Sequence, residues 1–258
     1  TAIQQVKDEG VQRTFKSVQE KLDRWYPLGY CNAGIILEAG LNTDGFKPGM
    51  RVACNGNHSE IVLVPKNLCS VIPESVSDET AAFAILGAIA LQGVRLAKPT
   101  LGEYFAVIGL GLVGLITVQL LHANGCKVLA IEPNEERARL GREFGAQVLA
   151  NDDTTSILSS AQQFTAGNGI GGVLIAAATD SEKPIEYSAR ICRKRGRIVL
   201  TGVTGLNINR SDFYEKEISF QISCSYGPGR YDKQYEDNGN DYPIGFVRWT
   251  EQRNISAI

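Results

Sequence analysis

The stretch that decides the fold of this chain is Gly109-Leu110-Gly111-Leu112-Val113-Gly114, a G-x-G-x-x-G motif. It follows an apolar run at 104–108 and opens a helical pattern over 115–123. This strand–turn–helix context is typical of a dinucleotide-binding turn, and the alternative is a glycine-rich turn in another kind of α/β protein. The first glycine is expected to make a tight turn, the second to let the backbone approach a pyrophosphate, and the third to let helix pack on strand. The pyrophosphate would then lie on the positive end of the helix.

Glu132 predicts which dinucleotide binds, because it ends the next apolar run at 127–131. A carboxylate at this position accepts both ribose hydroxyls of NAD. A 2′-phosphate there would be repelled, by roughly 4 kcal/mol for two unit charges about 4 Å apart at an effective dielectric near 20. Arg137 and Arg139 follow one turn later, and Arg137 either stacks on adenine or is solvated. NAD is therefore the predicted cofactor, and NADP is disfavoured without being excluded.

Two later strand ends are expected to line the same crevice, because open α/β sheets bind ligands at the carboxyl ends of their strands. One is 176–179, with Ala177 at its centre, and the other is Thr201-Gly202-Val203. Small residues here make room for the adenine ribose and the nicotinamide, or they serve packing alone.

Composition places the chain among globular proteins with two lobes. It has 258 residues, 43% of them hydrophobic and 21% charged, and a net charge of −2. No block of like charges suggests a nucleic-acid tail or a membrane-surface patch, and no apolar run reaches the length of a membrane span. The six cysteines are scattered without a C-x-x-C pair, which favours reduced thiols in a cytoplasmic protein.

The pattern along the chain predicts an α/β fold: a doubly wound, six-stranded parallel Rossmann sheet beside a smaller β domain. An amphipathic helix is expected over 3–25, and short strands over 34–39, 51–54 and 60–64. A helix starting at Ser77 should run to about residue 96. Strands and helices then alternate over 104–109, 112–124, 127–132, 134–144, 147–150, 154–166, 172–178, 182–193, 196–201 and 217–224. The expected units are a partial β domain at 1–76, a dinucleotide-binding domain at 77–225, and a segment at 226–258 that returns to the first lobe.

This order of lobes resembles the medium-chain dehydrogenase/reductase family, whose first lobe is GroES-like. The resemblance covers roughly residues 28–225. It rests on four segments: the glycine motif, 46–52 (Phe46-Lys47-Pro48-Gly49-Met50-Arg51-Val52), 59–65 and 81–93.

The zinc ligands of the alcohol-dehydrogenase branch are not carried over. Tyr30 stands where the resemblance requires a histidine, and Ala88 where it requires a cysteine; a further ligand position would fall before Thr1. Tyrosine and alanine do not supply the missing N or S donors. The four-cysteine loop of the structural zinc is also absent after Cys54. The resemblance therefore implies a zinc-independent member with no metal ligands.

A closer resemblance is to the N-terminal part of bacterial bi-domain oxidoreductases, on residues 28–34, 52–56, 223–232 and 242–254. In those proteins a zinc-less lobe of this kind is joined to a second, glucose-fructose-oxidoreductase-like domain. The resemblance implies a sugar-like substrate, such as a nucleotide sugar or a polysaccharide precursor, and a second oxidoreductase domain after Ile258.

Without zinc, a side chain must polarise or protonate the substrate oxygen during hydride transfer. Tyr30 is the leading candidate, with a pKa lowered by a nearby cation or backbone donors, and Asn32 and His58 are the other polar groups expected in the cleft. The alternative is that Tyr30 only packs there and the polariser precedes Thr1. The expected substrate mouth is formed by Ser225, Tyr226, Arg230, Tyr231 and Arg248.

The predicted function is hydride transfer between a nicotinamide cofactor and a hydroxyl or carbonyl of a small sugar-like molecule. Two alternatives remain: an NADPH-dependent quinone or enone reductase, and a dinucleotide-binding sensor without turnover. The strand at 217–224 is expected to pair across a two-fold axis in a homodimer.

Overall fold

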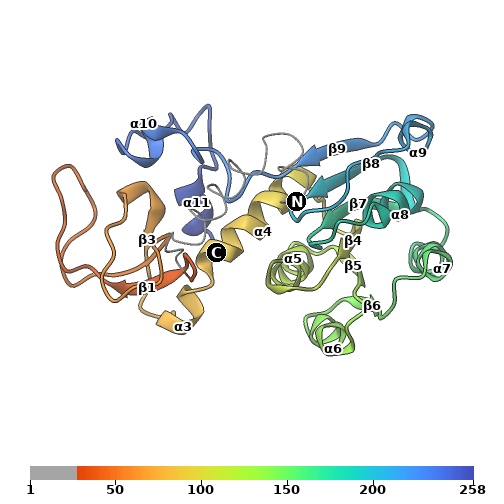
Figure 1. The fold of residues 1–258 in the computed structure, drawn as a ribbon, viewed down its shortest axis with the longest axis horizontal. Helices are drawn as coiled ribbons and strands as arrows, with labels where there is room; N and C mark the ends of the chain where they lie inside the picture. The colour runs from red at the N-terminus through yellow and green to blue at the C-terminus, as the bar shows by residue number, and fades with distance from the viewer. Residues whose placement is uncertain (1–27) are drawn as a thin grey trace, which may run out of the picture.

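The computed structural model describes residues 28–258 and shows two lobes joined by one long helix, α4 (Ala84–Ala97) (Figure 1). The smaller lobe holds an antiparallel sheet in the order β1-β2-β3, and the larger lobe a parallel sheet in the order β6-β5-β4-β7-β8-β9. The predicted fold class is confirmed. The helix expected over 3–25 lies outside the described residues.

The larger lobe follows the predicted alternation of strand and helix closely. Its strands are β4 (Tyr104–Ile108), β5 (Lys127–Ile131), β6 (Gln147–Leu149), β7 (Ile170–Ile175), β8 (Cys192–Leu200) and β9 (Ser219–Ile222). Its helices are α5 (Leu112–Ala123), α6 (Glu135–Glu143), α7 (Thr154–Phe164), α8 (Lys183–Ile191) and the short α9 (Arg210–Tyr214).

The sheet is buried on both faces, as near-continuous apolar strands predict. In β4, Phe105 and Val107 belong to the core formed with α4 and α5, whereas Ala106 and Ile108 belong to the core formed with α7 and α8. Side chains alternate across a strand, so helices on both faces are needed to cover β4. This arrangement fixes the carboxyl ends of the strands along one edge of the lobe.

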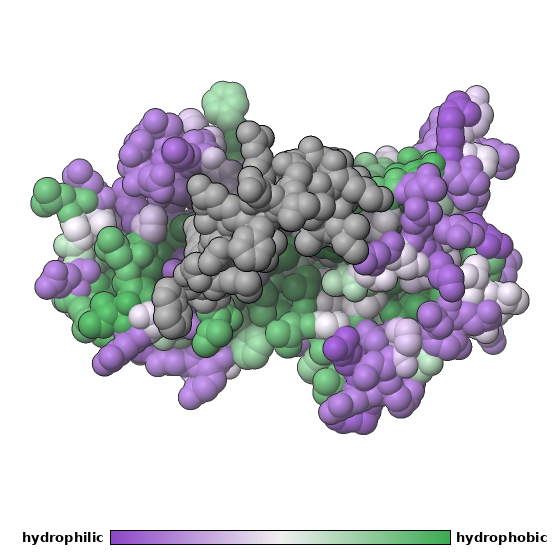
Figure 2. All heavy atoms as spheres, viewed as in Figure 1, coloured by the Kyte–Doolittle hydropathy of each residue, from purple (hydrophilic) through white to green (hydrophobic). Residues whose placement is uncertain are grey.

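The smaller lobe differs from its prediction in one strand. It consists of β1 (Asn32–Ile35), β2 (Arg51–Cys54), the 3-10 turn η1 (Lys66–Leu68) and β3 (Cys69–Val71). The strand at 51–54 is confirmed, and the one expected at 34–39 lies at 32–35. The strand expected at 60–64 is wrong, because these residues do not pair with any strand of the small sheet. Ile61 and Leu63 are 68% and 100% exposed. Hydrophobic residues gather on the surface of the smaller lobe in the view of Figure 2.

The helix expected over 77–96 is interrupted after its first turn. Ser77 caps α3 (Asp78–Ala81) as predicted, with its hydroxyl oxygen accepting the Thr80 N–H at 3.3 Å. Helix α4 then begins at Ala84 and crosses from one lobe to the other (Figure 1).

Residues 226–258 return to the smaller lobe through two short helices, α10 (Lys233–Glu236) and α11 (Glu251–Ile255). The Asn67 amide donates to the Tyr235 carbonyl at 2.8 Å, and the Gln252 amide donates to the Lys66 carbonyl at 2.8 Å. The expected contact of this segment with the first lobe is therefore present.

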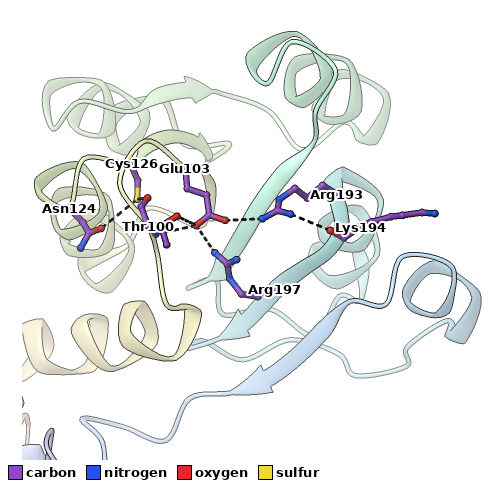
Figure 3. Close-up of polar contacts among 7 residues, drawn as sticks. All are labelled: Thr100, Glu103, Asn124, Cys126, Arg193, Lys194 and Arg197. Carbon is purple, nitrogen blue, oxygen red and sulfur yellow. Dashed lines mark hydrogen bonds and ion pairs between the residues drawn. The ribbon is translucent and has the colours of Figure 1, made fainter.

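The amino end of the large sheet is tied by Glu103, which precedes β4 (Figure 3). Its carboxylate accepts hydrogen bonds from Arg197 at 2.8 Å, Arg193 at 3.2 Å and the Thr100 N–H and hydroxyl at 3.1 Å each. These bonds link β4 to β8 across β7. No helix within residues 28–258 is both long and apolar enough to cross a bilayer.

Candidate functional site

The turn from β4 into α5 has the geometry that its three glycines predict. Gly109 has φ +86°, and a Cβ there would lie 2.8 Å from the Ala177 backbone. A Cβ on Gly114 would lie 1.9 Å from the Gly109 carbonyl oxygen, so only glycine lets α5 start this close to β4. A Cβ on Gly111 would meet no atom within 4 Å. The first and third glycines therefore shape the turn, and the second leaves open space beside the backbone.

Helix α5 starts at this open space, with Gly111 as its N-cap and no side-chain hydrogen bond closing its first turn. The N–H groups of Leu112, Val113 and Gly114 belong to that turn. A twelve-residue helix places partial positive charge there, which suits a phosphate. The residues present thus fit the pyrophosphate of a dinucleotide, since the open cradle and the uncapped helix start coincide.

A cavity of about 340 Å³ lies against this turn. Five residues predicted to bind the cofactor line it: Gly109, Gly111, Glu132, Arg137 and Ala177. The volume lies within the usual range for small-molecule sites, about 300–1,000 Å³. The predicted residues Leu112, Val113, Gly114, Thr201, Gly202 and Val203 are not among its lining residues.

The second predicted strand end lies beside the first, and its residues pack against the end of β7. Val203 forms a parallel bridge with Ala178, and a Cβ on Gly202 would lie 2.1 Å from the Ala177 carbonyl oxygen. The Thr201 hydroxyl donates to the Ile175 carbonyl at 3.0 Å. Residues 201–203 therefore hold the ends of β7 and β8 together, and their contact with a cofactor stays a prediction.

Glu132 is 5% exposed and has a structural role that the motif does not reveal. One carboxylate oxygen accepts the Leu110 N–H at 2.7 Å, and the other accepts the Asn134 N–H at 2.9 Å. The side chain thus connects the glycine turn to the start of α6. Each carboxylate oxygen keeps a free lone pair, so Glu132 can still accept hydroxyl groups from the cavity that it lines.

The cavity also contains polar residues that sequence reasoning missed: Asp152, Ser181, Lys183 and Tyr187. Burial, followed by the charges of Asp152 and Glu132, raises the pKa of the Tyr187 hydroxyl, which therefore stays protonated. Lys183 begins α8, after the carboxyl end of β7. Ligands of open α/β sheets bind at the carboxyl ends of strands, and this rule predicted residues 176–179. Extending it into the helix that follows, α8, would have found Lys183 and Tyr187.

The three candidate catalytic residues lie together in the smaller lobe and outside the cavity lining. Asn32 donates its amide to the Gly56 carbonyl and to the Asn57 carbonyl, the latter at 3.2 Å. The His58 ring nitrogen Nε2 lies 3.2 Å from the Cys31 carbonyl oxygen, and the backbone N–H of His58 donates to the Gly29 carbonyl at 3.0 Å. Both side chains therefore brace the loop that presents Tyr30.

Tyr30 is 45% exposed, and its pKa differs from the expected direction. Burial of part of the ring, with a smaller effect of Cys31, raises the pKa instead of lowering it. Contrary to the expectation from the sequence, the pKa of Tyr30 is thus not lowered by a nearby cation. The hydroxyl is thus protonated at neutral pH and suited to donate a proton.

Two expectations for the substrate mouth are corrected by the fold. Tyr226 is buried in the core of the smaller lobe, with Ile85, Ala88 and Ile255, because the returning chain packs its ring under α4. Arg230 forms an ion pair with Glu236 and is neutralised within its own segment. Arg248 and Tyr231 remain exposed.

Among residues 28–258, no three His, Cys, Asp or Glu side chains gather closely enough to hold a metal ion. Ala88, at the position where the resemblance requires a cysteine, is completely buried.

Residues 113–237 match the family described as "Zinc-binding dehydrogenase". This match supports a dehydrogenase-like domain in this part of the chain. The matched residues begin inside the glycine motif and include the cavity's Glu132, Arg137 and Lys183. The positions of Tyr30 and Ala88 lie outside them.

Among curated relatives, the chain is 23% identical over 245 residues to a probable D-xylulose reductase A of Neosartorya fischeri, covering 79% of this chain and 67% of that protein. It is 29% identical over 202 residues to a quinone oxidoreductase of Rattus norvegicus, covering 75% and 60%. Other matches cover as little as 43% of the relative. The chain thus spans about half to two thirds of the relatives' length.

A solved mycobacterial protein in complex with NADPH has the same fold, with a TM-score of 0.71 at 20% identity, covering 92% of this chain and 72% of that one. This likeness supports the arrangement of the two lobes.

Proposed function

We propose that this chain transfers a hydride between NAD and a hydroxyl or carbonyl carbon of a sugar-like small molecule, without zinc. The observation that carries the proposal is the open cradle at Gly111 beside the cavity lined by Glu132. When bound, the nicotinamide supplies the carbon that gives or takes the hydride. The relatives named as a reductase and an oxidoreductase support this reaction class, and the xylulose reductase supports a polyhydroxylated substrate.

In the proposed site, Gly111 and the first turn of α5 bind the pyrophosphate, and Glu132 accepts the hydroxyls of the adenine ribose. Arg137 and Lys183 line the same cavity and attract the negatively charged pyrophosphate of the cofactor. Tyr30 holds the proton at the substrate oxygen. Its raised pKa keeps the hydroxyl protonated at neutral pH, which is the form required of a proton donor to a carbonyl oxygen in the reductive direction.

The test is nicotinamide absorbance in the presence of polyols, ketoses and nucleotide sugars, with NAD and NADH. Substrate-dependent change supports the enzyme. Binding of NAD without any change across the panel would favour a dinucleotide-binding sensor. Tyr30→Phe should lower turnover about 100-fold or more while leaving cofactor affinity unchanged. Full activity of this variant would remove Tyr30 from the mechanism.

A quinone or enone reductase that uses NADPH is the second candidate, favoured by the quinone oxidoreductase relative and by Lys183 in the cavity. NADPH oxidation that depends on a quinone, with no turnover of polyols or ketoses, would select it. Metal analysis of the purified chain separates both proposals from a zinc enzyme: well under one zinc per chain is expected, and stoichiometric zinc would contradict the metal-free site.

We also propose a homodimer formed through β9, the edge strand of the large sheet. Ile222 on this strand is 55% exposed, and an apolar edge strand is a ready pairing surface. Light scattering after size exclusion should give twice the chain mass, and Ile222→Lys should shift it to the monomer.

A further inference from the structure

Two arginines meet around one tryptophan where α4 contacts the returning segment. The guanidinium carbon of Arg95, on α4, lies 3.4 Å from the centroid of the Trp249 ring. The guanidinium carbon of Arg248 lies 4.8 Å from the same ring. Both cations therefore approach the indole, which attracts them through its negatively charged faces.

Neither arginine forms an ion pair with a carboxylate within residues 28–258. Arg230 and Arg253 of the same returning segment do have such partners, Glu236 and Asp241. Burial and the neighbouring charge of Arg248 lower the pKa of Arg95 to about 10. Its buried Nη1 group finds no acceptor among the described residues. Among residues 28–258, these two neighbouring positive charges thus have no carboxylate partner.

The loop that carries Arg248 and Trp249 is held in place by the rest of the segment. Arg253 donates to the Val247 carbonyl at 2.6 Å, directly beside Arg248. The completely buried Asn254 donates to Gln92 of α4 at 3.2 Å and to the Tyr226 carbonyl at 2.7 Å. Gln92 and Arg95 lie one turn apart on α4, so the same bonds set the distance from Arg248 to Arg95.

We propose that Arg95 and Arg248 bind the phosphate group of a small molecule at the junction of α4 and the returning segment. A phosphate dianion offsets both charges, and its oxygens match the planar fork of donors that each guanidinium presents. Trp249 orients both forks. This site is separate from the cofactor cavity, whose lining contains neither arginine. The proposal does not depend on hydride transfer, because its test measures binding alone.

Trp249 provides the probe, since the chain has only two tryptophans, Trp25 and Trp249. In a Trp25→Phe background, the fluorescence of the remaining indole is titrated with inorganic phosphate, glucose 1-phosphate and glucose, at ionic strength held constant with sodium chloride. Saturable change is expected with the two phosphates and none with glucose. Tighter binding of glucose 1-phosphate than of inorganic phosphate identifies a phosphate ester as the ligand, and equal affinities identify free phosphate.

Arg248→Gln should weaken phosphate binding about tenfold or more, because it removes one of the two guanidinium groups. Arg248 is exposed, so we expect the variant to fold like the wild type. Arg95→Lys, which keeps the charge and loses the fork, should weaken it less. The matched control is Arg210→Gln, because Arg210 also lies over an aromatic ring, Tyr214, at 4.1 Å but has no second arginine recorded at that ring. No saturable change above sodium chloride, or equal binding by Arg248→Gln and Arg210→Gln, would overturn the proposal.

Discussion

Glu103, a partly buried carboxylate at the amino end of the large sheet, and Glu132, a buried carboxylate at its carboxyl end, have different kinds of partner. Arg193 and Arg197 surround Glu103, together with Thr100 (Figure 3). Glu132 has no cation within ion-pair distance among the described residues, and it is held by two backbone N–H groups. Arginine side chains therefore hold the carboxylate at the amino end of the sheet, and backbone N–H groups hold the one at the carboxyl end.

This difference shows why the functional site lies at one end. Around Glu103, positive and negative charges cancel, and the bonds connect strands to each other. Around Glu132, the charge is not cancelled and it faces a cavity that also touches the glycine turn. A carboxylate of this kind still attracts hydrogen-bond donors, such as ribose hydroxyls, from a ligand. Charge compensation, more than burial, separates the structural carboxylate from the one placed to bind.

A third carboxylate, Glu251, extends the comparison and gives the largest expected effect. It is completely buried, and neither oxygen has a hydrogen-bond partner among the described residues. Burial and the charge of Glu236 raise its pKa to about 8. The folded pKa lies above the unfolded value of 4.5. The stability that the protonated group provides is therefore lost as the pH rises from 4.5 to about 8. Glu251→Gln should therefore be more stable than the wild type.

The free energy of unfolding of Glu251→Gln should exceed that of the wild type by an amount that grows by up to about 1.4 kcal/mol per pH unit across this window and then levels off. Urea unfolding of both proteins between pH 5 and 9 measures it. A constant difference between the two proteins would show that Glu251 ionises normally in the fold.

Gly114→Ala should lower the free energy of unfolding by about 3 kcal/mol, because the added Cβ would lie 1.9 Å from the Gly109 carbonyl oxygen. Gly111→Ala is the matched variant in the same turn, with open space around its Cβ and a change expected below about 1 kcal/mol. Chemical denaturation compares the two. Equal stabilities would mean that helix α5 does not approach β4 as described.

Glu132→Gln should lower the free energy of unfolding by about 2 kcal/mol, because its amide group cannot accept from both the Leu110 and the Asn134 N–H. It should also weaken NAD binding, measured by calorimetry, because it removes an acceptor for the ribose. Unchanged affinity together with reduced stability would leave Glu132 a purely structural residue.

Glu103→Gln should cost about 1 kcal/mol and leave cofactor affinity unchanged, since Arg193 is partly exposed. Burial alone would raise the pKa of Glu103, but hydrogen bonds from Arg197 and Thr100 outweigh it and lower the pKa. The stabilisation is therefore present above the unfolded value of 4.5 and is lost as pH falls through the folded value. The unfolding temperature of the wild type should approach that of the variant as the pH is lowered from 7 to 3. Parallel curves would argue against these ion pairs.

The sequence predicted the large sheet well because its signals are local. Apolar runs between glycine-rich turns fix each strand, and Gly109 and Gly114 sit where only glycine fits. The strand at 60–64 was wrong because a short apolar run does not show whether another strand is available to pair with it. The second bonding role of Glu132 could not be predicted, since it depends on the distance between two turns 22 residues apart. Lys183 and the Arg95–Arg248 pair likewise depend on contacts between segments distant in sequence.

The most direct test of the account is the affinity of NADH for Gly111→Ala, measured by fluorescence titration. Gly34→Ala in β1 is the control, because its Cβ also meets open space but lies in the other lobe. We expect the Gly111 variant to fold normally and to bind NADH at least tenfold more weakly, while Gly34→Ala binds like the wild type. Equal NADH affinity of all three proteins would contradict a pyrophosphate at the turn between β4 and α5.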